Sequence, residues 1–185
     1  MTRPPASDDA TPRHARAYRR SGFTLIELLA VIIILAVVAM VAAPSLVGAA
    51  EARVRAGAQQ MARDLAYARG RAQSTGIAIW VRFTPAQSTY TVLAESGVGA
   101  GRNTALTITD PATGGPMVVR LDREESRGAT FSITGLTGNE VGFDRGGRPL
   151  NPDTSVLASN ATIAFPGGAT VTITGRTGNI SVVTP

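Results

Sequence analysis

An acidic residue lies inside the longest apolar run of the chain, and this combination constrains the protein more than any other feature. Of the 21 residues from Phe23 to Ala43, only Thr24 and Glu27 are polar. As a helix this run would be about 31 Å long, which is enough to cross the apolar core of a bilayer. A carboxylate in such a span costs about 2.5–3.5 kcal/mol on insertion scales, so Glu27 needs a partner or a function.

Three interpretations of this N-terminal region compete. A secretory signal peptide has a shorter apolar region followed by its cleavage site, so the length of the run and Glu27 both argue against it. An ordinary signal anchor explains the length and the preceding Arg19 and Arg20, which favour a cytoplasmic N-terminus. It leaves Glu27 unexplained. The third interpretation places a cleavage after Gly22, so that the apolar run is kept.

Residues 22–29 read GFTLIELL, and this stretch resembles the prepilin motif of type IV pilins and type II secretion pseudopilins. In that family a membrane peptidase cleaves after the glycine and methylates the new N-terminal residue. The resemblance implies cleavage at Gly22, N-methylation at Phe23, a leader at 1–22 and a transmembrane helix at 23–43. Pro44 falls where these helices usually carry a proline, and a helix break is expected there.

The chemistry of the span gives Glu27 a role in assembly. Cleavage after Gly22 creates a cationic amine at Phe23, four residues before Glu27. Opposite charges in a low dielectric are each costly alone and offset one another when they pair. In a helical filament, the amine of one subunit can reach Glu27 of its neighbour, so the pair would set the register of the subunits.

Residues 44–76 are predicted to form an amphipathic stem helix. Apolar residues recur at spacings of three and four from Val47 to Ala72, which is one face of a helix. Glu51 and Arg55 form a favourable i,i+4 pair, and the arginines of the other face are interpreted as solvated. The helix should end near Gly76, and its alanine-rich face should pack on the sheet of its own domain.

Residues 77–185 show the period of two that is typical of strands, separated by glycine and proline turns. The glycine-rich segment 97–103 is expected to be a mobile loop, and Asp144 is expected to hold a turn. The whole chain is therefore predicted to be α+β, with a long N-terminal helix packed on an antiparallel β-sheet domain, as in type IV pilins. The predicted strands are 77–83, 89–93, 105–109, 117–121, 130–133, 140–143, 162–165, 170–174 and 180–183.

Within the pilin family, the C-terminal part resembles the H-type minor pseudopilins of the GspH/FimT group. The stretch from Phe143 to Pro149 reads FDRGGRP and resembles their Phe-Asp-x-x-Gly turn. The hairpin at 163–174 and the closing Gly175-Arg176 pair also match. Some FimT-like members bind DNA through a Gly-Arg-x-Arg element, but here the second arginine is missing. Arg176 is retained as a contact for a partner or DNA, and nucleic acid is disfavoured because binding needs several phosphate contacts.

Composition excludes most catalytic chemistry. The chain has no cysteine, and its only histidine, His14, lies in the leader. Schemes that pair a serine or cysteine nucleophile with histidine are therefore excluded from the body of the chain, as are the commonest zinc ligands. All 18 basic residues are arginine, and much of the net charge of +5 belongs to the leader. We expect no enzyme activity, no catalytic residue, no cofactor and no metal.

The resemblance implies a minor pseudopilin, a structural subunit of the type II secretion pseudopilus that supports protein export. The alternative is a minor type IV pilin for pilus assembly or DNA uptake, and the sequence does not separate the two. A membrane-anchored hydrolase is a distant third. The implied partners are other pilins or pseudopilins near a filament tip, the prepilin peptidase/methyltransferase and an inner-membrane assembly platform. The implied location is the bacterial inner membrane, single-pass, with the N-terminus cytoplasmic and the C-terminal domain periplasmic.

Overall fold

A computed structural model describes residues 23–121, 126 and 128–184, and within its helix the side chains of residues 41–47 are not described. The chain divides into two compact units, Met1–Ala42 and Ala43–Pro185. The predicted leader and its cleavage residue Gly22 lie outside the described residues. Among the described residues, no helix is both long and apolar enough to cross a membrane. The predicted span at 23–43 extends into residues whose side chains are not described, and it remains a prediction.

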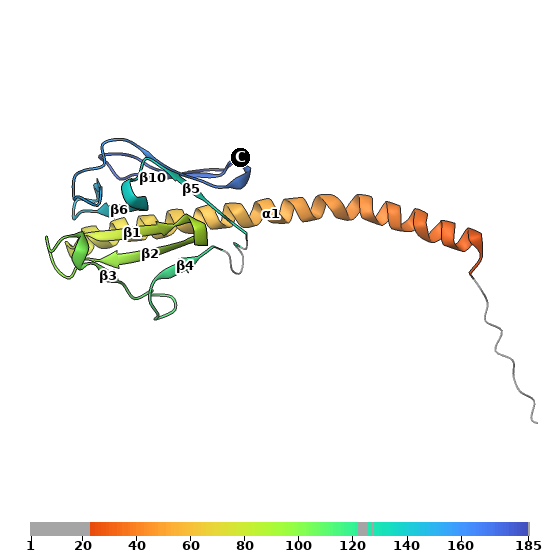
Figure 1. Cartoon of the computed structure of the whole chain (residues 1–185), viewed down its shortest axis with the longest axis horizontal. Coiled ribbons are helices and arrows are strands. Elements are labelled where there is room, and N and C mark those ends of the chain that lie inside the picture. The colour runs from red at the N-terminus through yellow and green to blue at the C-terminus, as the bar shows by residue number, and fades with distance from the viewer. Residues whose placement is uncertain (1–22, 122–125, 127, 185) are drawn as a thin grey trace, which may run out of the picture. The chain divides into compact units, whose positions relative to one another are not determined.

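One helix, α1, runs from Leu25 to Thr75 and contributes to both units (Figure 1). The helix continues through Pro44. The break predicted at that residue therefore does not end the helix. A proline inside a helix removes a single backbone donor, and the hydrogen bonds of the neighbouring turns remain. The helix ends where the sequence indicates, because Gly76 takes a left-handed conformation at φ +70°.

Two antiparallel sheets flank the second half of α1. The larger sheet has the strand order β3-β2-β1-β6-β7, with β4 pairing to β2, and the smaller has the order β10-β9-β8-β5. The strands of the larger sheet are β1 (Ile79–Thr84), β2 (Thr89–Ala94), β3 (Leu106–Thr107), β4 (Val118–Arg120), β6 (Glu140–Phe143) and β7 (Pro149–Leu150). Those of the smaller are β5 (Ser132–Thr134), β8 (Ala161–Ala164), β9 (Thr170–Ile173) and β10 (Ile180–Val183).

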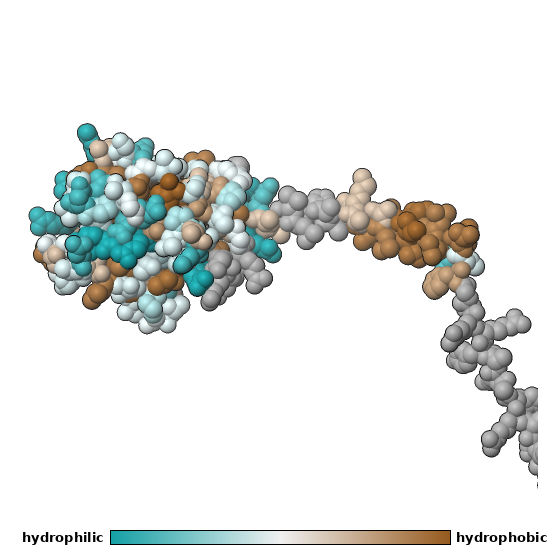
Figure 2. Space-filling view, in the orientation of Figure 1, coloured by the Kyte–Doolittle hydropathy of each residue, from teal (hydrophilic) through white to brown (hydrophobic). Residues whose placement is uncertain are grey.

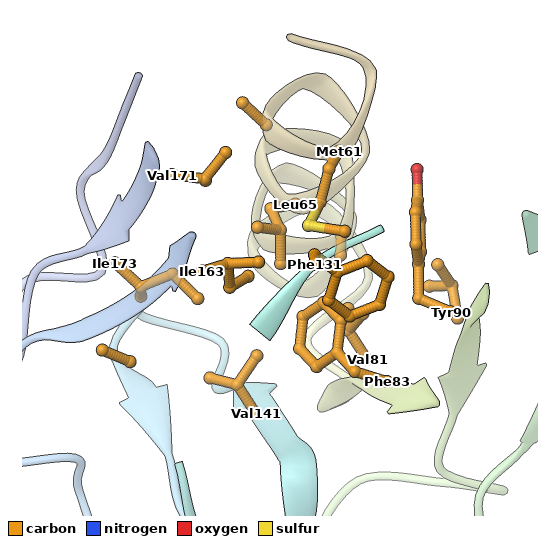
Figure 3. Close-up of a cluster of buried hydrophobic side chains, with 14 of the residues drawn as sticks. Met61, Leu65, Val81, Phe83, Tyr90, Phe131, Val141, Ile163, Val171 and Ile173 are labelled. Atoms are coloured by element: carbon orange, nitrogen blue, oxygen red, sulfur yellow. The ribbon is translucent and has the colours of Figure 1, made fainter. Parts of the chain in front are cut away.

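The core fills the space between α1 and the two sheets (Figure 3). From the helix come Ala58, Met61, Leu65, Ala68 and Ala72, all buried and all on the face that the sequence predicts. Small alanines let the backbone of α1 approach both sheets. The larger side chains come from the strands and loops and include Phe83, Tyr90, Phe131, Val141, Ile163, Val171 and Ile173. The prediction that the stem helix packs on its own sheet domain is confirmed.

The predicted strands are confirmed with small shifts, apart from two corrections. The strand expected at 105–109 is regular only over Leu106–Thr107, with an isolated bridge from Thr109 to Pro116, and β7 at Pro149–Leu150 was not predicted. Proline is a poor strand signal because it lacks a backbone donor, and β7 fits it only because it is a two-residue edge strand. The C-terminal meander β8-β9-β10 follows the hairpins that the sequence predicts.

Candidate functional site

The described part of the N-terminal segment starts at Phe23 and enters α1 through a capped end. The backbone N–H of Glu27 donates to Oγ1 of Thr24, with the two atoms 3.3 Å apart. Thr24 therefore occupies the N-cap position, and Glu27 is the third helical residue, where the helix dipole favours a negative charge. The carboxylate of Glu27 is exposed and makes no hydrogen bond or ion pair with another described residue.

The side chains around Glu27 form a continuous apolar surface. Every described side chain from residue 23 to residue 40 is exposed, and Phe23 is 76% exposed. Figure 2 shows this segment as an almost unbroken hydrophobic stretch. Exposed apolar surface of this extent marks a site for membrane or protein contact. The candidate site residues Phe23 and Glu27 therefore lie on a surface that needs an apolar environment.

The third described candidate, Arg176, lies in the turn between β9 and β10. It takes a left-handed conformation at φ +63°, and its backbone N–H donates to the carbonyl oxygen of Leu157 over 2.8 Å. Its side chain is exposed. The neighbouring Gly175 has no room for a Cβ, which would lie 2.6 Å from the carbonyl oxygen of Ala158. The Gly175-Arg176 pair is thus fixed by local backbone packing, and the arginine side chain is left exposed.

A half-buried arginine of α1, Arg69, joins this turn to a second one. Nε of Arg69 donates to the carbonyl oxygen of Gly147 at 3.1 Å, and Nη2 donates to the carbonyl oxygen of Thr177 at 3.2 Å. Arg69 was predicted only as part of a solvated face. No short-range pattern in the sequence points to these contacts, because the partner residues are 78 and 108 positions away.

The second turn is held by Asp144, as the sequence predicts. Oδ1 of Asp144 accepts hydrogen bonds from the backbone N–H groups of Gly146 and Arg148, and Oδ2 pairs with the Arg148 guanidinium at 2.8 Å. Partial burial opposes ionisation, but these donors outweigh it and lower the pKa of Asp144. The described structure therefore brings together the Asp144–Arg148 turn and the Gly175–Gly178 turn at the C-terminal end of α1.

The glycine-rich segment near residue 100 is tied to the larger sheet by a charge network. Arg102 pairs with Glu140 at 2.5 Å, and Arg82 of β1 pairs with the same carboxylate at 2.5 Å. The Arg102 guanidinium also lies over the ring of Trp80, 5.8 Å from its centroid. Sequence reasoning missed this network, because it depends on strand register: Arg82 and Glu140 are direct partners across β1 and β6.

The described residues show no arrangement suited to metal binding. No group of three or more His, Cys, Asp or Glu side chains within the described ranges is placed to hold an ion. The site candidates of this chain are therefore contact surfaces: the exposed apolar segment with Glu27, and the loop cluster that Arg69 joins.

Comparisons with known proteins give one match to the N-terminal segment and several matches to the fold. Residues 18–43 match the family model described as the prokaryotic N-terminal methylation motif. No curated protein sequence matches the chain significantly.

Solved structures with a similar fold include two of the minor pseudopilin EpsH from the type 2 secretion system of Vibrio cholerae. One gives a TM-score of 0.52 at 14% identity and covers 72% of this chain and 98% of that one. The other gives a TM-score of 0.51 at 13% identity and covers 73% and 94%. The type IV minor pilin FimU of Pseudomonas aeruginosa gives a lower TM-score of 0.44 at 16% identity, with 70% of this chain and 91% of that one covered. The chain thus carries the prokaryotic N-terminal methylation motif and has the type IV pilin-like fold of the minor pseudopilin EpsH.

Proposed function

We propose that the protein is a minor pseudopilin, a structural subunit of a type II secretion pseudopilus that supports protein export. The observation that carries this proposal is the occurrence of the N-terminal methylation motif and the EpsH-like fold in one chain. The motif supports processing and membrane anchorage, and the fold supports a role in a filament of related subunits.

Processing would remove residues 1–22 by cleavage after Gly22 and methylate the new amino group at Phe23. Residues 23–43 would then anchor the chain in the bacterial inner membrane, with the N-terminus cytoplasmic and the β domain periplasmic. The exposed apolar side chains of residues 23–40 support this arrangement, because a bilayer or neighbouring helices would remove them from water. A prepilin peptidase/methyltransferase and an inner-membrane assembly platform are the partners that these steps need.

The protein would act without catalysis. Glu27 would pair with the methylated amine of a neighbouring subunit, and its exposed carboxylate with no described partner supports this role. The β domain would supply contacts to other pseudopilins near the filament tip, and Arg176 is an exposed residue suited to such a contact.

The test is a deletion strain complemented with the wild-type gene or with Gly22→Ala. Intact-mass measurement of the membrane-extracted wild-type chain should show an N-terminus at Phe23 that carries one methyl group. Gly22→Ala should leave the leader attached and fail to restore export of folded proteins. A chain that keeps its leader in the wild type would contradict the proposal and favour a signal anchor.

The same strains separate the secretion pseudopilus from a type IV pilus. Loss of protein export with normal twitching and DNA uptake is the expected result. Normal export together with defective twitching or transformation would instead assign the chain to a pilus.

A further inference from the structure

The smaller sheet ends in an unprotected edge strand. β10 pairs with β9 on one side only, and its four residues make it longer than β3, β5 or β7 at the other sheet edges. Its sequence, Ile180-Ser181-Val182-Val183, contains no charged residue and no proline. Its register with β9 has no bulge from Ile180 to Val183, and the two residues that oppose Thr174, Gly178 and Asn179, lie in the preceding turn. Charges, prolines and bulges are the usual devices that stop an edge from pairing with another chain, and β10 has none of them.

The register shows which backbone groups of β10 are available. Hydrogen-bonded pairs alternate along an antiparallel ladder, and the N–H of Thr174 donates to the carbonyl oxygen of Asn179 at 2.8 Å. Ser181 and Val183 therefore direct their backbone N–H and C=O groups toward β9, as the carbonyl group of Asn179 does. Ile180 and Val182 direct their N–H and C=O groups away from the sheet. None of these four groups has a hydrogen bond to a described residue.

These free backbone groups lie beside a groove. A shallow hollow of about 330 Å³ lies between β10 and α1 and is lined by Gln59, Ala62, Arg63, Ala66, Ile180 and Val182. Ala62 and Ala66 leave room for a second backbone to approach the helix. Their spacing of four residues corresponds to about 6 Å along a helix, close to the roughly 6.7 Å between alternate residues of a strand. Arg63 is the only charged side chain among the residues that line the groove.

We propose that this groove receives an extended segment of a protein partner, which adds to β10 as a fifth strand of the smaller sheet. The four outward backbone groups of Ile180 and Val182 supply the main-chain hydrogen bonds of strand addition. Small or β-branched side chains of the partner would face Ala62 and Ala66, and an acidic side chain would pair with Arg63. The exposed Val183 extends the contact at the end of β10.

A second copy of this chain fits the groove poorly in a membrane. Two copies of β10 would pair about a two-fold axis, and the two strands would then run in opposite directions. The part of α1 from residue 43 to residue 75 belongs to the same compact unit as β10, so this stem would be reversed as well. Two chains anchored in one membrane need parallel stems. This choice of a different protein rests on the proposed membrane anchorage, whereas the groove itself does not depend on it.

Two substitutions block the groove in different ways. Val182→Pro removes an outward N–H and leaves the ladder to β9 intact, because proline is tolerated at an edge whose N–H faces solvent. Ala66→Trp fills the groove from the helix side. Ala52→Trp is the matched control, since Ala52 is also an exposed alanine of α1 and does not line the groove.

The probe is a phage-displayed library of random peptides, selected against the full-length chain in detergent micelles. Enriched peptides should carry alternating β-branched residues and an acid, and should slow amide exchange at Ile180 and Val182. Their Kd should weaken at least tenfold with Ala66→Trp and with Val182→Pro, and stay within twofold with Ala52→Trp. Arg63→Glu should weaken the binding of the acidic peptides. If Val182→Pro does not fold, the effect of Ala66→Trp on peptide binding still tests the proposal.

Failure to enrich any peptide, or binding that neither groove variant weakens, would overturn the proposal. A chain that is dimeric by light scattering and becomes monomeric with Ala66→Trp would show that the occupant is a second copy, which also overturns it. None of these outcomes depends on cleavage after Gly22 or on protein export, so the groove and the proposed function can fail separately.

Discussion

Tyr90 of β2 donates its hydroxyl hydrogen bond to Oδ2 of Asp64 on α1, with the two oxygens 2.5 Å apart. Burial raises the pKa of Asp64, and this effect outweighs the opposing hydrogen bond from Tyr90 and the nearby charge of Arg63. Burial and the Asp64 charge also raise the pKa of Tyr90 far above its ordinary range. The contact joins the stem helix to the larger sheet through a carboxyl group that burial makes harder to ionise than in water.

Asp64 should make the domain less stable as the pH rises. Its pKa is higher in the folded chain than the ordinary value of 3.8. The stabilisation is therefore fully present below that value and is lost as the pH rises through the folded pKa. Asp64→Asn removes this dependence. The free energy of unfolding of the variant should therefore rise relative to that of the wild type as the pH increases from acid to neutral. Urea unfolding of residues 43–185 across that range measures it, and a constant difference would contradict the prediction.

Tyr90→Phe provides the complementary change. It leaves the buried carboxylate without its donor, which should cost about 1.5–3 kcal/mol of unfolding free energy at neutral pH. The cost should shrink in acid, where Asp64 is protonated. An equal cost at both pH values would show that the hydroxyl contributes only to packing.

Arg69 should hold the two loop turns at the C-terminal end of α1. Arg69→Ala removes the donors to Gly147 and Thr177 and should lower the unfolding free energy by about 1–3 kcal/mol. Amide exchange should rise at residues 144–148 and 175–178. Arg69→Lys should restore only part of the protection, because a single ammonium cannot reproduce the fork of a guanidinium. Arg53→Ala, at an exposed arginine of the same helix, is the control and should change neither quantity.

Glu140 should stabilise the domain at neutral pH and not in acid. Burial disfavours its carboxylate, but the hydrogen bonds from Arg102 and Arg82 outweigh burial and lower its pKa below 4.5. This contribution is present above the ordinary pKa and is lost as the pH falls through the lowered one. Glu140→Gln should therefore cost about 1–3 kcal/mol at neutral pH, since Arg102 is largely buried and loses its charged partner. Chemical unfolding at neutral and acid pH checks this, and a cost that persists in acid would refute it.

Short-range patterns in the sequence were enough to predict the stem helix and most of the strands. The spacing from Ala58 to Ala72 indicates the buried face of α1, and the period of two indicates the strands, because each pattern repeats within a few residues. The Glu51–Arg55 pair and the Asp144 turn are confirmed for the same reason. Each of them joins residues no more than four positions apart.

Long-range contacts could not be predicted in this way. Arg69 contacts Gly147 and Thr177, and Arg102 of the loop before β3 contacts Glu140 of β6, only after the chain has folded. An arginine on a helix face has the same local pattern whether water or a distant carbonyl accepts its hydrogen bond. The groove beside β10 likewise depends on strand order and ladder phase, and neither is visible in the local sequence.

Glu27 should be required for assembly and not for processing. Glu27→Ala should leave cleavage after Gly22 and methylation at Phe23 unchanged, as read by intact mass, and should remove the chain from purified filaments. Glu27→Gln should behave in the same way, because it keeps the shape and loses the charge that pairs with a neighbour's amine.

A local role is the competing explanation, since Glu27 lies in the first turn of α1, where a negative charge stabilises the helix by about 0.3–1 kcal/mol. Thr24→Ala separates the two explanations. It removes the N-cap hydrogen bond to the backbone of Glu27, at a cost of about 1 kcal/mol, and keeps the carboxylate. If helix-end stability were the reason for the acid, Thr24→Ala and Glu27→Gln would impair assembly alike. If the charge pairs between subunits, Thr24→Ala assembles and Glu27→Gln does not, whereas normal assembly of Glu27→Ala would rule out the pairing altogether.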